Sequence, residues 1–185
     1  MSLWGNDIKP KNLTDAEKKE VFANTKGWVR EAGSILSGNG NTSADPEVLV
    51  AIGGLSANMG SANITELEFI TTSFDKSDGG TLQVRARFNE PVTVTGTPQL
   101  TVVNDQRANH TLSYASGSTT NELVFSLTIA AANAATNAGD ELSLGANAIS
   151  LNGGTIKDTG QSGTNATITN AASIGTAAGT ITVAA

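Results

Sequence analysis

The sequence predicts a mainly β protein, an antiparallel β-sandwich preceded by an N-terminal arm that contains a short helix. From residue 64 onward, apolar and polar residues alternate with a period of two, which is typical of half-buried strands. Turn residues, chiefly Gly, Asn, Asp and Thr, interrupt this alternation at short intervals, as in antiparallel sandwiches. Earlier residues show neither feature, so we expect an arm at 1–62 and a sandwich at 63–185.

The first element expected in the arm is a helix over about residues 15–24. Thr14 and Glu17 have the spacing of a capping box, in which each side chain accepts a hydrogen bond from the other residue's N–H. A lone helix of this length is marginally stable in water and needs a packing partner. We therefore expect the arm to rest on the sandwich or on another molecule.

The second organised piece of the arm covers about residues 47–52. Asp45 and Pro46 form a helix start signal, but the run that follows them is rich in branched residues and ends at Gly53. Helix and strand both remain open here, and we favour a short strand or extended segment.

The clearest strand runs from Thr81 to Phe88. It places Leu82 and Val84 on one face and Arg85 and Arg87 on the other. Pro91 and Pro98 lie at strand ends, where a missing N–H is tolerated. Further strands are expected at 64–69, 99–104, 109–115, 122–129, 148–151, 167–169 and 179–183.

Composition limits the function classes. The chain has 185 residues, a net charge of −6 and a pI of about 4.7, which opposes binding to nucleic acid through its phosphates. Six of its eleven basic residues fall within the first thirty positions, so the arm and the sandwich differ in charge. There is no Cys, no apolar run long enough for a membrane span and no signal-peptide pattern. We expect a protein that is made and used without secretion or membrane insertion.

Three separated motifs resemble the bacterial Ig-like modules of large repetitive surface proteins and adhesins. They are the runs at 88–100, at 111–128 and at 149–158, in the order that the family shows. The resemblance covers about residues 66–184 and implies an immunoglobulin-like sandwich of non-catalytic character, used as a spacer or a binding module. Here the module occurs once, whereas the adhesins carry tandem arrays.

The arm resembles the start of virion structural proteins of marine tailed bacteriophages, in the runs at 1–6, 9–11, 21–29 and 48–55. Together the two resemblances imply a head decoration (cement) protein that binds the major capsid protein and displays an Ig-like domain, with self-association on the capsid left open. The expected location is the virion surface, after synthesis in the host cytoplasm. The alternatives are a neck, tail or fibre-base component and, from another class, a bacterial cell-surface adhesin.

Large apolar side chains in the arm are the candidate anchors. Trp4, Phe22 and Trp28, with Val21, are too few to form a core of their own. They either pack on the sandwich or insert into a partner, where Trp is enriched among the residues that dominate affinity. We favour partner docking to the capsid.

Candidate catalytic groups are few, and we expect no enzyme and no cofactor. His110 is the single histidine, lies in an expected strand and has no nucleophile motif around it. Glu66 and Glu68 share a strand face and offer an acid/base pair, although strand alternation alone explains two exposed carboxylates. A host-surface glycan as ligand has little support, because Tyr114 is the only Tyr and the sandwich has no Trp.

Calcium is a weak alternative. Asp75 and Asp78 flank a Gly-rich turn, and with Asp158 they would supply oxygen ligands if their loops converge. The dense acidic spacing of calcium loops is missing, and Asp-Gly is also ordinary turn chemistry.

Overall fold

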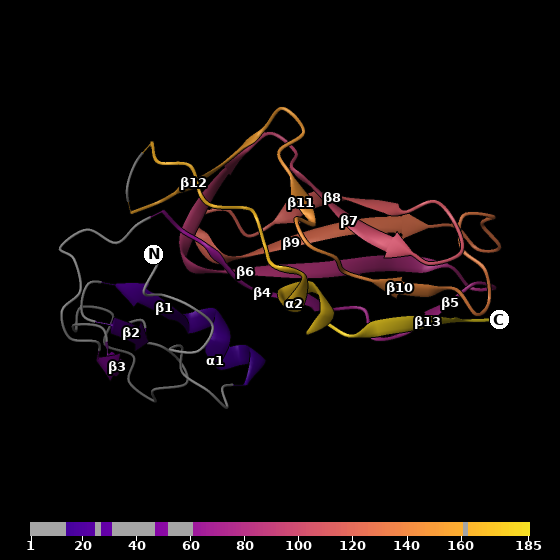
Figure 1. The fold of residues 1–185 in the computed structure, drawn as a ribbon, viewed down its shortest axis with the longest axis horizontal. Helices are drawn as coiled ribbons and strands as arrows, with labels where there is room; N and C mark the ends of the chain where they lie inside the picture. Colours follow the sequence, from indigo (N-terminus) through magenta and orange to yellow (C-terminus); the bar gives the residue numbers. More distant parts are fainter. Residues whose placement is uncertain (1–13, 25–26, 31–46, 52–60, 161–162) are drawn as a thin grey trace.

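The computed structural model describes residues 14–24, 27–30, 47–51, 61–160 and 163–185. Figure 1 shows a large β structure with a smaller unit, formed by α1 and β1–β3, against one end of it. The elements are α1 (Asp15–Glu20), β1 (Val21–Asn24), β2 (Gly27–Arg30), β3 (Glu47–Ala51), β4 (Ile64–Phe69), β5 (Phe74–Asp75), β6 (Gly80–Thr95), β7 (Gln99–Asn104), β8 (His110–Ser116), β9 (Thr120–Ile129), β10 (Glu141–Ser143), β11 (Ile149–Ser150), β12 (Thr155–Asp158), α2 (Ala172–Thr176) and β13 (Thr180–Ala184).

The N-terminal region, defined as the described residues up to 51, is more strand-rich than the sequence predicted. The helix ends at Glu20, and Val21 begins a strand that pairs with β2, which in turn pairs with β3 in an antiparallel sheet. The predicted helix over 15–24 is therefore too long. Val21, Phe22, Trp28 and Val29 are β-branched or aromatic, and such residues favour a pleated sheet over a helix. The strand favoured at about 47–52 is confirmed as β3.

The large sheet is organised around β6, a strand of 16 residues. Its first half pairs with β4 on one side and β9 on the other, while its last four residues pair with β12. The register with β9 shifts between Arg87 and Val92, so residues 88–91 form an irregular segment that includes Pro91. Because Pro has no N–H to donate, such an irregularity is where it is tolerated inside a strand.

The remaining strands curl around to close the sandwich. Hydrogen bonds connect neighbouring strands in the order β12-β6-β9-β8-β7-β10-β13-β5, and β11 pairs with β7. This order passes from one layer of the sandwich into the other. The strands in this path pair antiparallel, except that β13 runs parallel to β5. The mainly β, sandwich-like fold that the sequence predicted is thus present.

Apolar side chains from both layers meet in one core. Phe88, Phe125, Leu67 and Leu112 are almost completely buried there, and Tyr114 packs edge-to-face on Phe125 with ring centroids 6.2 Å apart. All members of this cluster lie at residue 62 or later. The core is built mostly from Leu, Val, Ile and Ala, in keeping with the low aromatic content.

Most predicted strands are found with small changes at their ends, and β7 matches its predicted limits. The segment predicted at 167–169 is the exception, because it contains only an isolated parallel bridge between Thr167 and Asn63. The short elements β5, β10, β12 and α2 were not predicted, since two to five residues give no readable period. Within the described residues, neither helix has the length or apolar character to cross a membrane.

Candidate functional site

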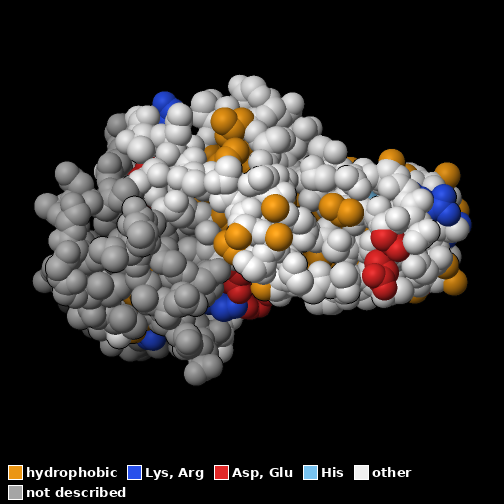
Figure 2. Space-filling view, in the orientation of Figure 1, with side chains coloured by type: hydrophobic (Ala, Val, Ile, Leu, Met, Phe, Trp, Pro, Cys, Tyr) orange, Lys and Arg blue, Asp and Glu red, His pale blue; other side chains and the backbone are white. Residues whose placement is uncertain are grey.

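The main polar feature of the described structure is an ionic seam between α1 and the outer face of β4, β6 and β9. Among the described residues, its ion pairs join four acidic and four basic side chains. Its members are Asp15, Lys18, Lys19, Glu66, Glu68, Arg85, Arg87 and Glu122. Figure 2 shows blue and red side chains side by side at the border between the sandwich and the N-terminal region.

Strand register creates the sandwich side of the seam. Antiparallel pairing sets Glu66 opposite Arg87 and Glu68 opposite Arg85, and on the other side of β6 it sets Arg87 opposite Glu122. Arg87 Nη1 lies 2.8 Å from Glu66 Oε2 and 2.8 Å from Glu68 Oε2, and its Nε lies 3.3 Å from Glu122 Oε2. Opposite charges on directly facing strand positions stabilise a sheet, so the three strands form one ladder of charge pairs.

The helix supplies the other side. Lys18 Nζ donates to Glu66 Oε1 at 3.0 Å, and Asp15 Oδ2 lies 3.3 Å from Arg85 Nη2. Lys19 Nζ is 3.9 Å from Glu122 Oε1 at the margin. Each face therefore presents both signs of charge to the other, and α1 is held in one register on the sheet.

The two arginines lie deepest in the seam. The side chains of Arg85 and Arg87 are 9% and 4% exposed, whereas Asp15 is 60% exposed. Burial opposes ionisation of Glu66, but hydrogen bonds from Arg87 and Lys18 outweigh it and hold the pKa of Glu66 below its ordinary value. Burial likewise opposes the charge of Arg85, while Glu68 and Glu122 raise its pKa overall. Glu66 and Arg85 remain charged at neutral pH because each faces partners of opposite sign.

One hydrogen-bonding side chain reinforces the seam. Asn121, which is buried in β9, donates from Nδ2 to the backbone oxygen of Val21 at 2.9 Å and approaches that of Lys18 at 3.4 Å. Both acceptors lie where α1 ends and β1 begins. Asn121 therefore satisfies carbonyl groups at the end of the helix, which the helix itself leaves without partners.

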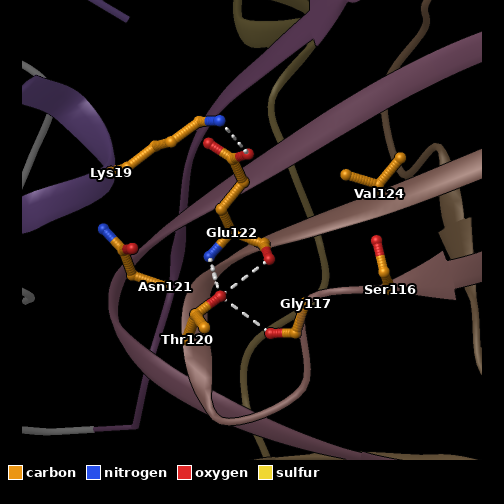
Figure 3. Close-up of a pocket in the computed structure, with 7 residues that line it drawn as sticks. All are labelled: Lys19, Ser116, Gly117, Thr120, Asn121, Glu122 and Val124. Carbon is orange, nitrogen blue, oxygen red and sulfur yellow. Dashed lines mark hydrogen bonds and ion pairs between the residues drawn. The ribbon is translucent and has the colours of Figure 1, made fainter. Parts of the chain in front are cut away.

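A pocket of about 230 Å³ opens at the margin of the seam (Figure 3). Lys19 reaches into it from α1 toward Glu122, and Thr120 hydrogen-bonds across the turn to the backbone of Gly117 and Glu122. Gly117 has a φ of +108°, and a Cβ there would lie 1.9 Å from the Glu122 oxygen, so only glycine fits. The volume is below the roughly 300–1,000 Å³ of ligand pockets, so we interpret it as the open end of the seam.

His110 lies in a separate buried network. Its Nε2 is 3.1 Å from the Thr136 hydroxyl, and Asp140 nearby accepts from Asn104 Nδ2 at 2.9 Å and pairs with Arg107 at 3.2 Å. Burial lowers the pKa of His110 and Asp140 opposes this only in part, so the imidazole is neutral at pH 7. A hydroxyl beside an imidazole suggests nucleophilic chemistry, but Thr136 is 1% exposed and offers a substrate no approach in this conformation. The network fastens the segment before β10 to β7 and β8.

The three calcium candidates do not converge. Asp75 and Asp78 lie at the β5–β6 turn, whereas Asp158 is paired with Val92, near the other end of β6. Figure 1 shows β5 and β12 toward opposite ends of the molecule. The loops therefore do not converge as the weak calcium alternative required, and within the described residues no group of three acidic or histidine side chains has metal-binding geometry.

The predicted anchors have different surroundings. Trp28 and Val21 are 4% and 5% exposed, so they pack within the chain, and Phe22 is half-buried. Trp4 lies outside the described residues. The carboxylates proposed as an acid/base pair, Glu66 and Glu68, are both engaged by arginines of the seam.

Sequence reasoning missed the seam, although its ingredients were visible. Alternation correctly placed Arg85 and Arg87 on the face opposite Leu82 and Val84. It could not reveal that a segment about 70 residues earlier in the chain covers that face. The signal that could have indicated the seam is the spacing of its charges. Arg85 and Arg87 lie two residues apart in one strand, and Glu66 and Glu68 lie two residues apart in another.

Comparison with known proteins gives no further guide, because no protein family, no curated protein and no solved structure matches this chain.

Proposed function

We propose that this chain is a structural protein of a bacteriophage virion, specifically a head decoration or cement protein. In this proposal residues 1–62 bind the major capsid lattice, and the sandwich, Ig-like by the sequence resemblance, is displayed outward. The protein acts without catalysis or cofactor. Its contribution to the particle is the apolar and polar area that it buries where capsid subunits meet.

One structural observation supports this proposal most. The seam fixes α1 on one end of the sandwich through ion pairs of defined partners, including Lys18–Glu66 at 3.0 Å and Asp15–Arg85 at 3.3 Å. The rest of the sandwich extends away from that end (Figure 1). A base that is held in one orientation, with a domain projecting from it, is the arrangement that a displayed capsid protein needs.

The burial of Trp28 and Val21 refines the proposed anchoring. Those two side chains serve the small N-terminal sheet, so Trp4 is the better anchor candidate in the arm. Replacing Trp4 with Ala should lower the amount of protein on purified virions. Replacing Trp28 with Ala should lower the unfolding midpoint, because that ring is 4% exposed.

Absolute copy number in purified virions tests the proposal directly. Quantitative mass spectrometry, referenced to the major capsid protein, should find hundreds of copies per particle if the protein decorates the lattice. A count on the order of a dozen would favour the neck, tail or fibre-base alternative, since those parts have low cyclic symmetry. Absence from virions would contradict both and favour the cell-surface adhesin.

A further inference from the structure

Two buried carboxyl groups lie near the point where the chain passes from the N-terminal region into the sandwich. Glu90 lies in the irregular part of β6 and is 8% exposed, and Asp158 ends β12 and is 2% exposed. Neither belongs to the seam. They adjoin the junction segment, which we define as residues 61–63.

The junction segment is tied down by side chains around these carboxyls. Asp158 Oδ2 accepts from the Ala62 N–H at 3.1 Å, and Asn89 Oδ1 accepts from the Asn63 N–H at 2.6 Å. On the opposite side, the Thr167 N–H donates to the Ala62 oxygen at 2.7 Å. These contacts make a clasp that fixes the direction in which the chain enters β4.

The two carboxyl groups have unequal support. Asp158 accepts from two backbone donors, Ala62 N at 3.1 Å and Gly160 N at 2.8 Å. Glu90 accepts from Asn89 Nδ2 at 3.4 Å, a long contact for a carboxylate buried this deeply. Glu90 is therefore the carboxyl group with less hydrogen-bond support for a negative charge.

Electrostatics agree with this geometry. Burial, and secondly the like charge of Asp158, raises the pKa of Glu90 to about 7. Asp158 of β12 is the one charged group that acts on Glu90 among the described residues. The junction segment itself consists of Ser, Ala and Asn and brings no charge.

We propose that Glu90 and Asp158 make the junction a pH-sensitive clasp, closed while Glu90 holds its proton and loosened when Glu90 ionises above neutral pH. Ionised Glu90 repels Asp158, which holds the Ala62 N–H, and attracts the amide of Asn89, which holds Asn63. Loosening releases the junction segment at the start of β4, while the seam continues to hold α1 on the sheet. The clasp is independent of the proposed virion function.

Hydrogen exchange at the amides of Ala62 and Asn63 tests the clasp in the full chain. After correction for the intrinsic rate, protection in the wild type should fall about tenfold between pH 5.5 and pH 8.5. Glu90→Gln is neutral and has nearly the same shape. Its amides should keep, at pH 8.5 as well as at pH 5.5, the protection that the wild type has at pH 5.5. Glu141→Gln, an exposed change of equal charge in β10, should retain the wild-type response.

Protection that does not change with pH in the wild type would overturn the proposal, as would a Glu90→Gln protein that responds like the wild type. A second test uses the wild-type protein alone and follows the NMR chemical shift of the Ala62 amide as a function of pH. The shift should follow a midpoint near 7, whereas a midpoint in the ordinary carboxyl range of about 4 to 4.5 would contradict the clasp.

Discussion

The sandwich and the N-terminal region are stabilised by different physical means. The sandwich buries a continuous apolar core that includes Phe88, Phe125 and Leu112, each at most 1% exposed. The N-terminal region buries a few apolar side chains of its own, among them Trp28 and Val29, and meets the sandwich through ion pairs. Apolar burial scales with area and is insensitive to salt, whereas partly exposed ion pairs contribute little each and are screened. The sandwich should therefore remain folded under conditions that detach the N-terminal region.

The chain carries separate optical probes for the two regions. Both of its tryptophans, Trp4 and Trp28, lie in the N-terminal part, and its single tyrosine, Tyr114, lies in the sandwich. Tryptophan fluorescence therefore reports the N-terminal region, and far-UV circular dichroism reports mainly the larger sandwich. Differences between the two signals measure how independently the regions unfold.

The largest expected effect comes from the sandwich core. Phe125→Ala should lower the free energy of unfolding by about 3–5 kcal/mol, because the ring is completely buried and contacts Tyr114. Urea titration should show both signals shifting together, since the N-terminal region loses its support when the sandwich unfolds. Leu151→Ala, at a side chain that is 36% exposed, is the control and should change the free energy by less than about 0.5 kcal/mol. Equal effects of the two changes would contradict the assigned core.

The second effect separates the regions. Arg87→Met removes the side chain that pairs with Glu66, Glu68 and Glu122, and should cost about 1–3 kcal/mol. The figure is below that for fully buried pairs because Glu66 and Glu68 keep 26% and 29% of their side-chain surface exposed. The three glutamate partners of Arg87 lie in the sandwich, and its 3.8 Å contact with Asp15 reaches α1. Both midpoints in urea should therefore fall, and the tryptophan midpoint should fall further than the circular dichroism midpoint.

Arg107→Met is the matched control for this change. It removes the same charge from a side chain that pairs with Asp140, within the sandwich. It should leave the separation between the two signals as in the wild type. The same separation in both variants would contradict the role of the seam.

Removing the hydrogen bonds that Asn121 donates to the end of the helix should have a smaller effect on the free energy of unfolding. Asn121→Ala leaves the Val21 carbonyl without its 2.9 Å donor and should cost about 1–2 kcal/mol, seen in the tryptophan signal. Asn152→Gly is the control, at an exposed residue that donates to the Thr97 oxygen at 3.2 Å and has a φ of +45°, which glycine tolerates. A larger loss from Asn152 than from Asn121 would mean that this contact does not hold the helix.

Acidification should affect the seam gradually. Because the folded-state pKa of Glu66 is lowered, its stabilising contribution is present above the ordinary carboxyl range and is lost as the pH falls through the folded value below it. Below about pH 4, tryptophan fluorescence should change before far-UV circular dichroism does. Glu66→Gln should remove part of that acid-induced step, and an unchanged step would exclude Glu66 as its source.

Local pattern was a good guide to the sandwich and a poor one to the N-terminal region. Alternation defined β7, most of β9 and the first half of β6, because each of these strands has one face on the core. The helix was extended past Glu20 because capping signals define where a helix starts and nothing in the sequence marks its end. The pairing of Val21–Asn24 with the neighbouring β2 was missed because four-residue strands give no readable period. The helix that covers Arg85 and Arg87 is a long-range contact that no local period encodes.

The same limit explains the candidate sites. Asp75, Asp78 and Asp158 each lie in turn-rich sequence, but the length of β6 keeps Asp158 apart from the other two. No sequence pattern marks Glu90, because its burial depends on β12 and on the junction segment. Composition alone showed that the charges of the two regions differ. It did not show that Lys18 and Asp15 of α1 pair with Glu66 and Arg85 of the sandwich.

Urea unfolding of the wild-type chain, followed by both signals at low and at 1 M salt, tests the central claim most directly. The account predicts a tryptophan midpoint below the circular dichroism midpoint, and a wider gap at high salt, where the screening length is about 3 Å. Coincident midpoints at both salt concentrations would show that the N-terminal region and the sandwich form one cooperative unit, and would contradict the account.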